Sequence, residues 1–213
     1  MAAPKTVLLV VDVQNDFCPG GALAVPRGDE VVAPLNRMIR RFRAAGLPVM
    51  LSRDWQPIRT KHFKEFGGTW PPHCIQGTRG AEFHPKLEVP RGATIFSKGM
   101  DPKADAYSCF QATTENGAPF AAWLAAQRIR RLYVGGLSTD YCVFQTTLDA
   151  RRKGYEVVVL EDAIRAVDVS AGDGDRAIAE MRRVGARFAS TTQAIPSKPR
   201  VGTRPQARDS KSR

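Results

Sequence analysis

Short apolar runs alternate with amphipathic stretches along most of this chain, and this alternation is the feature that most constrains its fold. Six runs have the length and composition of buried strands: residues 6–11, 48–52, 94–97, 131–135, 156–160 and 187–189. Four stretches have helical periodicity: residues 29–45, 119–127, 139–153 and 174–184. Strands that alternate with helices build βα units around a parallel sheet. The pattern therefore predicts the α/β class, as a three-layer α/β/α domain with a mainly parallel sheet.

The chain is organised as one domain with a basic extension. Its 213 residues are enough for a single domain with a substantial core. The net charge is +11, and nearly half of the excess lies in residues 197–213, which contain almost no apolar residues. Such a segment is typical of a disordered tail. We therefore expect a folded domain over residues 1–196 and a solvated tail, with no specific nucleic-acid partner, because the folded part has no basic and aromatic binding signature.

The composition also indicates the compartment. No apolar stretch approaches the length of a membrane span, and the first apolar run ends too soon to be a signal peptide. The four cysteines are scattered without a metal or disulfide spacing. We expect a cytoplasmic protein without a membrane partner, in which Cys18, Cys74 and Cys109 are free packing residues.

Three of the apolar runs lead into residues that carry chemistry. Asp12 follows the first run, Lys98 follows the third, and Cys142 comes shortly after the fourth. The carboxyl ends of parallel strands share one edge of a sheet, so these groups are expected to meet there. Cys142 also begins a helical pattern, where the helix dipole favours a thiolate. A base, a cation and a thiol form a covalent catalyst, although each residue alone is equally compatible with a turn, an exposed strand end or a packed core.

A long irregular segment interrupts the alternation between residues 53 and 90. It is rich in glycine, proline and tryptophan, and it contains all three histidines of the chain, His62, His73 and His84. Loops of this length in compact domains are usually functional. The segment is therefore a candidate binding region.

Together these local motifs resemble the isochorismatase-like cysteine hydrolases, and within them the nicotinamidases. The resemblance covers roughly residues 5–190. It depends on five motifs: Asp12-Val13-Gln14-Asn15-Asp16-Phe17, Arg53-Asp54-Trp55, the segment 67–78 with its Gly-Gly-Thr-Trp-Pro-Pro-His-Cys core, Lys98-Gly99, and Ser138-Thr139-Asp140-Tyr141-Cys142-Val143.

The resemblance implies an isochorismatase-like hydrolase fold and a cysteine amidohydrolase that converts nicotinamide to nicotinate and ammonia. Asp12, Lys98 and Cys142 would be its catalytic triad, with Cys142 forming a thioester. It further implies a cis peptide bond between Leu137 and Ser138, so that the backbone N–H groups of Ser138 and Cys142 face the oxyanion.

The resemblance also implies a divalent metal, zinc or iron, that binds the ring nitrogen of the substrate. Its ligands would be Asp54, His62 and His73, and imidazole with carboxylate suits such ions. The family commonly has Asp-x-His at this position, whereas this chain has Gln56 in place of the histidine. Three outcomes stay open: His62 replaces the missing imidazole, Gln56 binds weakly, or the site holds no metal. His84 receives no role.

Phe17, Trp70 and Tyr107 match positions that enclose the flat substrate ring in relatives, although ordinary core packing is an alternative. Two other functions remain under consideration: hydrolysis of a different small amide within the same superfamily, and a catalytically silent binding protein that uses the basic tail. The expected partner is a small-molecule amide, and a homo-oligomer stays open.

Overall fold

The protein contains a six-stranded, entirely parallel sheet. A computed structural model describes residues 5–194, so the basic tail predicted at 197–213 and both ends of the domain predicted at 1–196 lie outside the described residues. The spatial order of the strands is β3-β2-β1-β4-β5-β6. Their bounds are Thr6–Val11 for β1, Val49–Asp54 for β2, Thr94–Lys98 for β3, Arg131–Leu137 for β4, Glu156–Arg165 for β5 and Arg187–Ala189 for β6. The predicted α/β class is confirmed.

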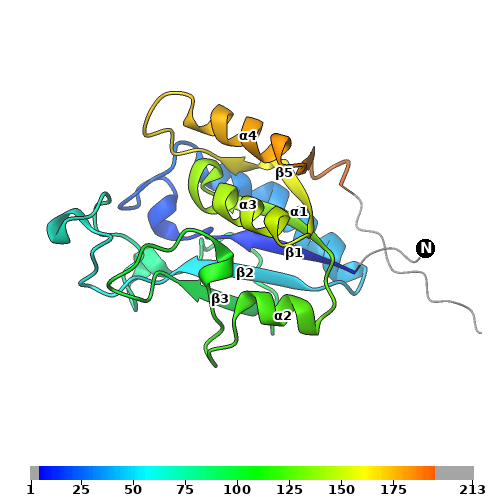
Figure 1. Ribbon diagram of the computed structural model, residues 1–213, viewed down its shortest axis with the longest axis horizontal. Helices are drawn as coiled ribbons and strands as arrows, with labels where there is room; N and C mark the ends of the chain where they lie inside the picture. The colour runs from blue at the N-terminus through cyan, green and yellow to red at the C-terminus, as the bar shows by residue number, and fades with distance from the viewer. Residues whose placement is uncertain (1–4, 195–213) are drawn as a thin grey trace, which may run out of the picture.

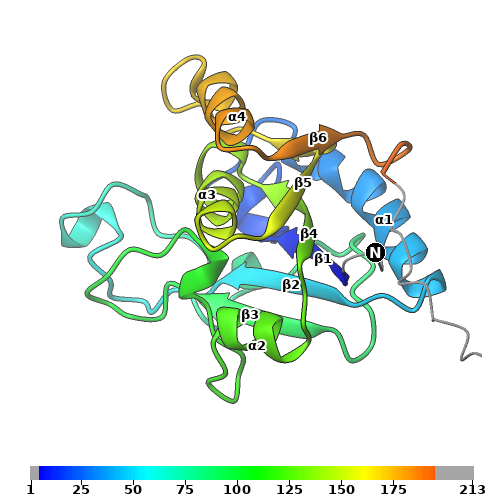
Figure 2. The same ribbon diagram turned by 45° about the vertical axis from the view of Figure 1, so that its right-hand side comes forward.

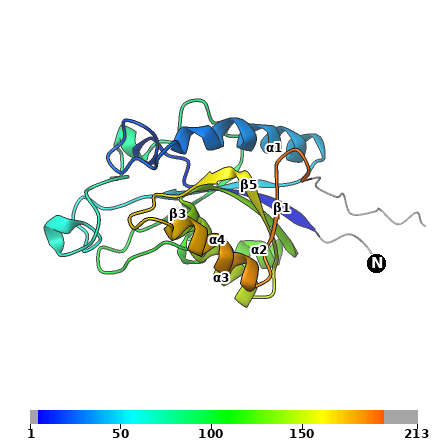
Figure 3. The same ribbon diagram turned by 90° about the horizontal axis from the view of Figure 1, so that it is seen from above.

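Four α-helices cover the two faces of the sheet. They are α1 (Val32–Ala44), α2 (Phe120–Ala126), α3 (Phe144–Arg152) and α4 (Asp173–Arg183). Helix α1 lies on one face, whereas α2, α3 and α4 lie on the other (Figures 1 and 3). This is the predicted three-layer arrangement.

The central strand β1 connects the two halves of the core. Leu8 and Val10 pack into the cluster that includes the α1 side chains, and Val7 and Leu9 pack into the cluster that includes side chains of α2, α3 and α4. Successive side chains of a strand point to opposite faces. A strand that is apolar at every position is therefore buried on both sides, as β1 is along its whole length.

The predicted elements are all present, with differences at their ends. Strands β2, β4 and β5 continue for two or more residues beyond the predicted ends, because residues at the carboxyl edge still pair with neighbouring strands. The helix predicted over 29–45 begins with a 3-10 turn, Gly28–Val31, before α1. The helix predicted over 139–153 begins with a π-helical turn, Thr139–Val143, before α3. Further 3-10 turns are Asn15–Phe17, Lys64–Phe66, Arg79–Ala81 and Cys109–Gln111.

The irregular segment between β2 and β3 extends beyond the carboxyl ends of these strands, at the left in Figure 2. It is anchored to the domain by hydrogen bonds: Gln14 Nε2 donates to the carbonyl oxygen of Ala81, and the Cys74 N–H donates to Asp16 Oδ2. Among the helices within residues 5–194, none is long and apolar enough to cross a membrane.

Candidate active site and metal site

Four neighbouring strands each bring one functional group to the carboxyl edge of the sheet. In spatial order, β3 ends at Lys98, β2 ends at Asp54, β1 leads into Asp12, and β4 leads into the turn that carries Cys142. Lys98 and Asp54 are direct partners in the register of β3 and β2. Because the spatial order of the strands differs from their order in the sequence, groups that are far apart in the sequence lie close together at this edge.

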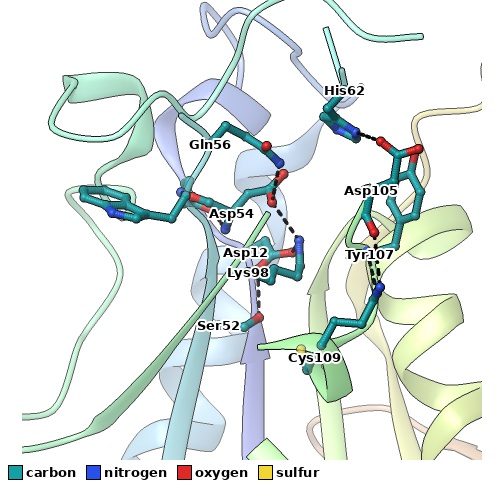
Figure 4. Close-up of polar contacts among 12 residues, drawn as sticks. Asp12, Ser52, Asp54, Gln56, His62, Lys98, Asp105, Tyr107 and Cys109 are labelled. Carbon is teal, nitrogen blue, oxygen red and sulfur yellow. Dashed lines mark hydrogen bonds and ion pairs between the residues drawn. The ribbon is translucent and has the colours of Figure 1, made fainter. Parts of the chain in front are cut away.

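Lys98 is fully buried between two carboxylates. Its Nζ lies 3.0 Å from Asp12 Oδ2 and 3.1 Å from Asp54 Oδ1 (Figure 4). The other oxygen of Asp12, Oδ1, accepts a hydrogen bond of 2.8 Å from the Ser52 hydroxyl. A buried ammonium is stable only when it is paired, so Lys98 depends on both carboxylates.

The backbone around Asp12 turns sharply at the end of β1. Asp12 has φ of 48°, and aspartate tolerates this left-handed conformation better than most residues do. Beside it, Gly136 of β4 approaches so closely that a Cβ atom there would lie 2.0 Å from the carbonyl oxygen of Val11. Glycine at 136 thus allows β4 to bring the Cys142 turn next to Asp12.

Cys142 lies in the π-helical turn Thr139–Val143, between β4 and α3. Turns of this kind are frequent at functional sites. The peptide bond between Leu137 and Ser138 is cis, as the resemblance implied. Ser138 and Cys142 both line the same pocket, and their backbone N–H groups as oxyanion donors remain a prediction.

The electrostatics of Cys142 differ from the sequence-based expectation. Burial raises the pKa of Cys142 well above the ordinary thiol value, and the positive charge of Lys98 opposes this rise without cancelling it. The sequence favoured a thiolate through the helix dipole and free backbone N–H groups, whereas burial and the two neighbouring carboxylates act against the thiolate. A base close to the sulfur would therefore assist formation of the thiolate.

Asp12 is placed to be that base. Burial raises the pKa of Asp12, and the charge of Lys98 acts in the opposite direction. Among residues 5–194, no well-aligned hydrogen bond reaches Asp12 Oδ2, although the same oxygen lies close to Lys98. The contact with Asp12 is also among the causes that raise the pKa of Cys142. A carboxylate with a raised pKa and a free lone pair is suited to accept the thiol proton.

Burial lowers the pKa of Lys98, but the charges of Asp12 and Asp54 outweigh it and hold that pKa well above the ordinary value. Lys98 therefore stays charged. It can hold both a carboxylate and a thiolate in the buried pocket.

Asp54, His62 and His73 form a cluster that could hold a metal ion. Each offers one ligand atom, and these atoms lie within 4.8 Å of one another. All three residues are buried, with 4% or less of their surfaces exposed. The structure therefore brings together the three predicted ligands.

The two histidine rings are oriented by other groups. Nδ1 of His62 donates to Asp105 Oδ1 at 2.7 Å, and Nδ1 of His73 donates to the carbonyl oxygen of Pro71 at 2.8 Å. The tautomers follow from these acceptors. Nε2 of each ring then carries the free lone pair, as in most metal-binding histidines. Burial lowers the pKa of His62, so its ring is neutral and able to bind a metal.

Nε2 of His73 lies 3.4 Å from Asp54 Oδ2. Two lone pairs would face each other here, so a shared cation would stabilise the arrangement. Burial raises the pKa of Asp54, but the positive charge of Lys98 opposes this rise, and the net pKa is well below the ordinary value. Asp54 is thus an ionised carboxylate whose Oδ1 faces Lys98 and whose Oδ2 faces His73. The donor set fits a divalent cation.

Aromatic side chains form one wall of the pocket between the triad and this cluster. Trp70 Nε1 donates to the Tyr107 hydroxyl at 2.9 Å, and the Trp70 ring packs edge-on against Tyr141 with centroids 4.9 Å apart. Phe17 contacts the His73 ring with centroids 5.4 Å apart. All three predicted aromatic residues line the pocket.

Several site residues were missed by the sequence reasoning. The pocket is also lined by Leu23, Val25, Tyr141 and Val167. Ser52, Gln14 and Asp105 act from behind it: Gln14 holds the backbone of Asp54 through both ends of its amide, at 2.7 Å each. Tyr141 and Gln14 lie within the motifs quoted above and could have been found there. Asp105 gives no such signal, because a lone loop carboxylate is usually solvated.

The histidine without an assigned role, His84, is not among the residues that line this pocket. Cys18, Cys74 and Cys109 are free and buried, as predicted.

Comparison with known proteins agrees with this geometry. The family model "Isochorismatase domain" matches residues 6–193. A nicotinamidase of Escherichia coli is 40% identical over 202 residues, which cover 86% of this chain and 93% of that protein. A nicotinamidase/pyrazinamidase of Mycobacterium tuberculosis is 40% identical over 181 residues, which cover 82% and 93% of the two chains.

Among solved structures, the pyrazinamidase of Pyrococcus horikoshii in complex with zinc superposes with a TM-score of 0.80 at 41% identity. The match covers 88% of this chain and 99% of that one. The chain therefore belongs to the isochorismatase family of hydrolases. Within the family, these relatives are nicotinamidases and pyrazinamidases, and the resemblance found in the sequence is confirmed.

Proposed function

We propose that this protein is a nicotinamidase that hydrolyses nicotinamide to nicotinate and ammonia through a thioester on Cys142. One observation carries the proposal: Cys142, beside Asp12 and Lys98, lines the same aromatic-walled pocket as the Asp54, His62 and His73 cluster. A flat heteroaromatic amide needs both a nucleophile at its carbonyl and an anchor for its ring. The names of the relatives point to the same substrate class.

The first half of the reaction forms the thioester. Asp12 takes the proton of the Cys142 thiol, and the sulfur attacks the amide carbon. The developing oxyanion is stabilised by backbone N–H groups of Ser138 and Cys142, and one such donor typically contributes about 3 kcal/mol. Asp12 then gives its proton to the leaving nitrogen, so that the carbon–nitrogen bond breaks and ammonia departs.

The second half regenerates the thiol. Asp12 accepts a proton from a water molecule, which attacks the thioester carbon. The carbon–sulfur bond breaks, nicotinate is released, and the proton returns to the Cys142 sulfur. Lys98 remains charged throughout and compensates whichever of Asp12 and Cys142 is ionised.

Asp54, His62 and His73 would hold a divalent cation, zinc or iron, next to the aromatic wall. When bound, this ion would act as a Lewis acid for the ring nitrogen of the substrate. The ionised carboxylate and the two Nε2 atoms of the oriented rings support this assignment. Phe17, Trp70 and Tyr107 would enclose the ring, so that the carboxamide points to Cys142.

A second candidate is the hydrolysis of a different small amide of the same superfamily. The observation that favours it is Gln56, which replaces the histidine that the family commonly has at this position. If metal binding is weak, the substrate does not need a ring nitrogen to bind the ion, and other small amides become possible substrates.

The decisive assay measures ammonia release from nicotinamide, pyrazinamide and benzamide, with and without a strong chelator. We expect turnover of the two substrates that have a ring nitrogen, loss of that turnover with the chelator, and poor hydrolysis of benzamide. Equal turnover of benzamide, without chelator sensitivity, would support the second candidate. Absence of ammonia from all three amides would disprove both.

A further inference from the structure

Gln56 is held rigidly beside the metal cluster. Its backbone N–H donates to the Cys74 carbonyl oxygen, and its own carbonyl oxygen accepts from the Gln76 N–H, each at 2.9 Å. Only 1% of its surface is exposed. Its side-chain Nε2 donates to Asp54 Oδ1 at 3.1 Å. The amide of Gln56 therefore adjoins the carboxylate of the metal cluster (Figure 4).

The other end of this amide has no such partner. Oε1 of Gln56 is buried, and no donor within residues 5–194 reaches it. An unsatisfied buried acceptor costs about 1–3 kcal/mol, and such groups are rare in folded proteins. Asp12 Oδ2 also lacks a hydrogen-bond donor, but it lies 3.0 Å from the charged Nζ of Lys98.

The orientation of the amide follows from its neighbours. If oxygen and nitrogen were exchanged, the amide oxygen would face the ionised Asp54 carboxylate, acceptor against acceptor. Gly99 also keeps space for the amide, because a Cβ at 99 would lie only 2.2 Å from Gln56 Nε2. Nitrogen therefore faces Asp54, and the free lone pairs of Oε1 remain for another positive group.

We infer that Gln56 serves the metal site proposed above in two ways: Nε2 holds Asp54, and Oε1 is a fourth protein ligand. The site would then consist of one carboxylate, two imidazoles and one amide oxygen. Amide oxygens suit harder ions such as Mn²⁺ better than imidazole does, whereas imidazole suits zinc. Compared with a histidine at 56, Gln56 therefore shifts the preference of the site away from zinc and toward Mn²⁺.

Metal competition on the purified full-length protein, without substrate, tests this inference. The ratio of the Mn²⁺ to the Zn²⁺ dissociation constant is measured against a coloured chelator for the native protein and for Gln56→His. We expect the replacement to raise this ratio in favour of zinc by about tenfold or more. An unchanged ratio would overturn the inference. Gln127→Leu, at the exposed end of α2 and not among the residues that line the pocket, is the matched control and should leave the ratio unchanged.

A second measurement separates a ligand from a residue that only positions Asp54. The absorption spectrum of the Co²⁺-loaded protein reports the atoms that bind the ion, so Gln56→Leu should change it if Oε1 is a ligand. An unchanged spectrum, in a variant that melts like the native protein, would show that Gln56 only positions Asp54. A structure of the Mn²⁺-loaded protein should have Oε1 within about 2.2 Å of the ion; an Oε1 that binds only water would contradict the inference.

These outcomes are independent of the proposed reaction. Native protein that binds metal with the expected preference but does not hydrolyse nicotinamide would disprove the function and leave the inference intact. Hydrolysis of nicotinamide by a protein that binds none of these ions would disprove the inference and leave the proposed hydrolysis intact.

Discussion

The two halves of the pocket are built in different ways. The triad half is carried by the sheet: Asp12 and Lys98 stand at strand ends, and Cys142 follows β4 after one turn. In the metal half only Asp54 belongs to a strand, whereas His62 and His73 lie on the irregular segment between β2 and β3. The sheet fixes Cys142, Asp12 and Asp54, while loop contacts such as that of Asp105 with His62 fix the two histidines. We therefore expect the two halves to fail separately, except at Lys98, which contacts a carboxylate of each half.

The largest expected effect is the loss of the nucleophile. Cys142→Ala should reduce the turnover of nicotinamide by at least about 10⁴-fold, because no other group can form the thioester. Its metal content and melting temperature should stay near native values, since the metal half is not touched. Cys18→Ala is the control and should retain activity. Substantial turnover by Cys142→Ala would rule out covalent catalysis.

The next effect concerns the buried ion pairs. Asp12→Asn and Lys98→Met should each lower kcat by orders of magnitude, and the double variant should lose little more, because groups that act together are non-additive. Lys98→Met should also lower the melting temperature, since Asp12 and Asp54 would lose their shared cation. Kinetics and thermal melts of the three variants check this. Losses that multiply would indicate that the two residues act independently.

His73→Ala changes the metal half and tests whether the triad half is affected. The variant should lose stoichiometric metal and most nicotinamide turnover, because one ligand of the cluster is gone. The rate at which iodoacetamide alkylates Cys142 should remain within about threefold of native, since the triad is held by the sheet. Metal analysis and mass spectrometry provide the two readouts. A parallel loss of both would show that the halves are one unit.

A smaller effect is expected at Asp105, which positions His62. Asp105→Ala should weaken metal binding by about 10–100-fold, the usual cost of removing such a partner. Asp105→Asn keeps an acceptor for Nδ1 of His62 and should recover part of this loss. Asp101→Ala, in the same connection between β3 and α2, is the control. Equal metal affinities for the native protein and all of these variants would show that Asp105 does not position His62 for metal binding.

The smallest effect concerns stability in alkali. Burial raises the pKa of Cys109 to about 11, from 9.0. A thiol whose folded pKa is raised stabilises the fold fully below pH 9, and this contribution is lost as the pH rises from 9 to about 11. Cys109→Ala should therefore flatten the decline in unfolding free energy across this window, as measured by urea denaturation. An unchanged slope would contradict the raised pKa.

The same contrast explains how much could be predicted from the sequence. The strands, the layers and the convergence of Asp12, Lys98 and Cys142 follow from apolar periodicity and the geometry of parallel sheets. His62 and His73 were reached only through a family resemblance, because irregular loops have no periodicity that predicts their contacts. Ser52 and Asp105 could not be identified, since partners that act through hydrogen bonds depend on packing and not on spacing.

Gln56 is a position where the sequence shows a difference from the family but not its consequence. The sequence shows that an expected histidine is absent, but it does not show what the replacement does. Only the structure reveals that Nε2 contacts Asp54 while Oε1 is left without a donor among the described residues. The positions of these two atoms are what allow a chemical role for Gln56 to be proposed.

The central claim is that Cys142 attacks an aromatic amide held by the metal half of the pocket. The most direct test is to quench the native, metal-loaded protein during turnover of nicotinamide and to map its peptides by mass spectrometry. We predict a nicotinoyl group on Cys142 that disappears when the substrate is exhausted and does not form after metal removal. An unmodified Cys142 during sustained release of ammonia, or an acyl group on another residue, would contradict the account.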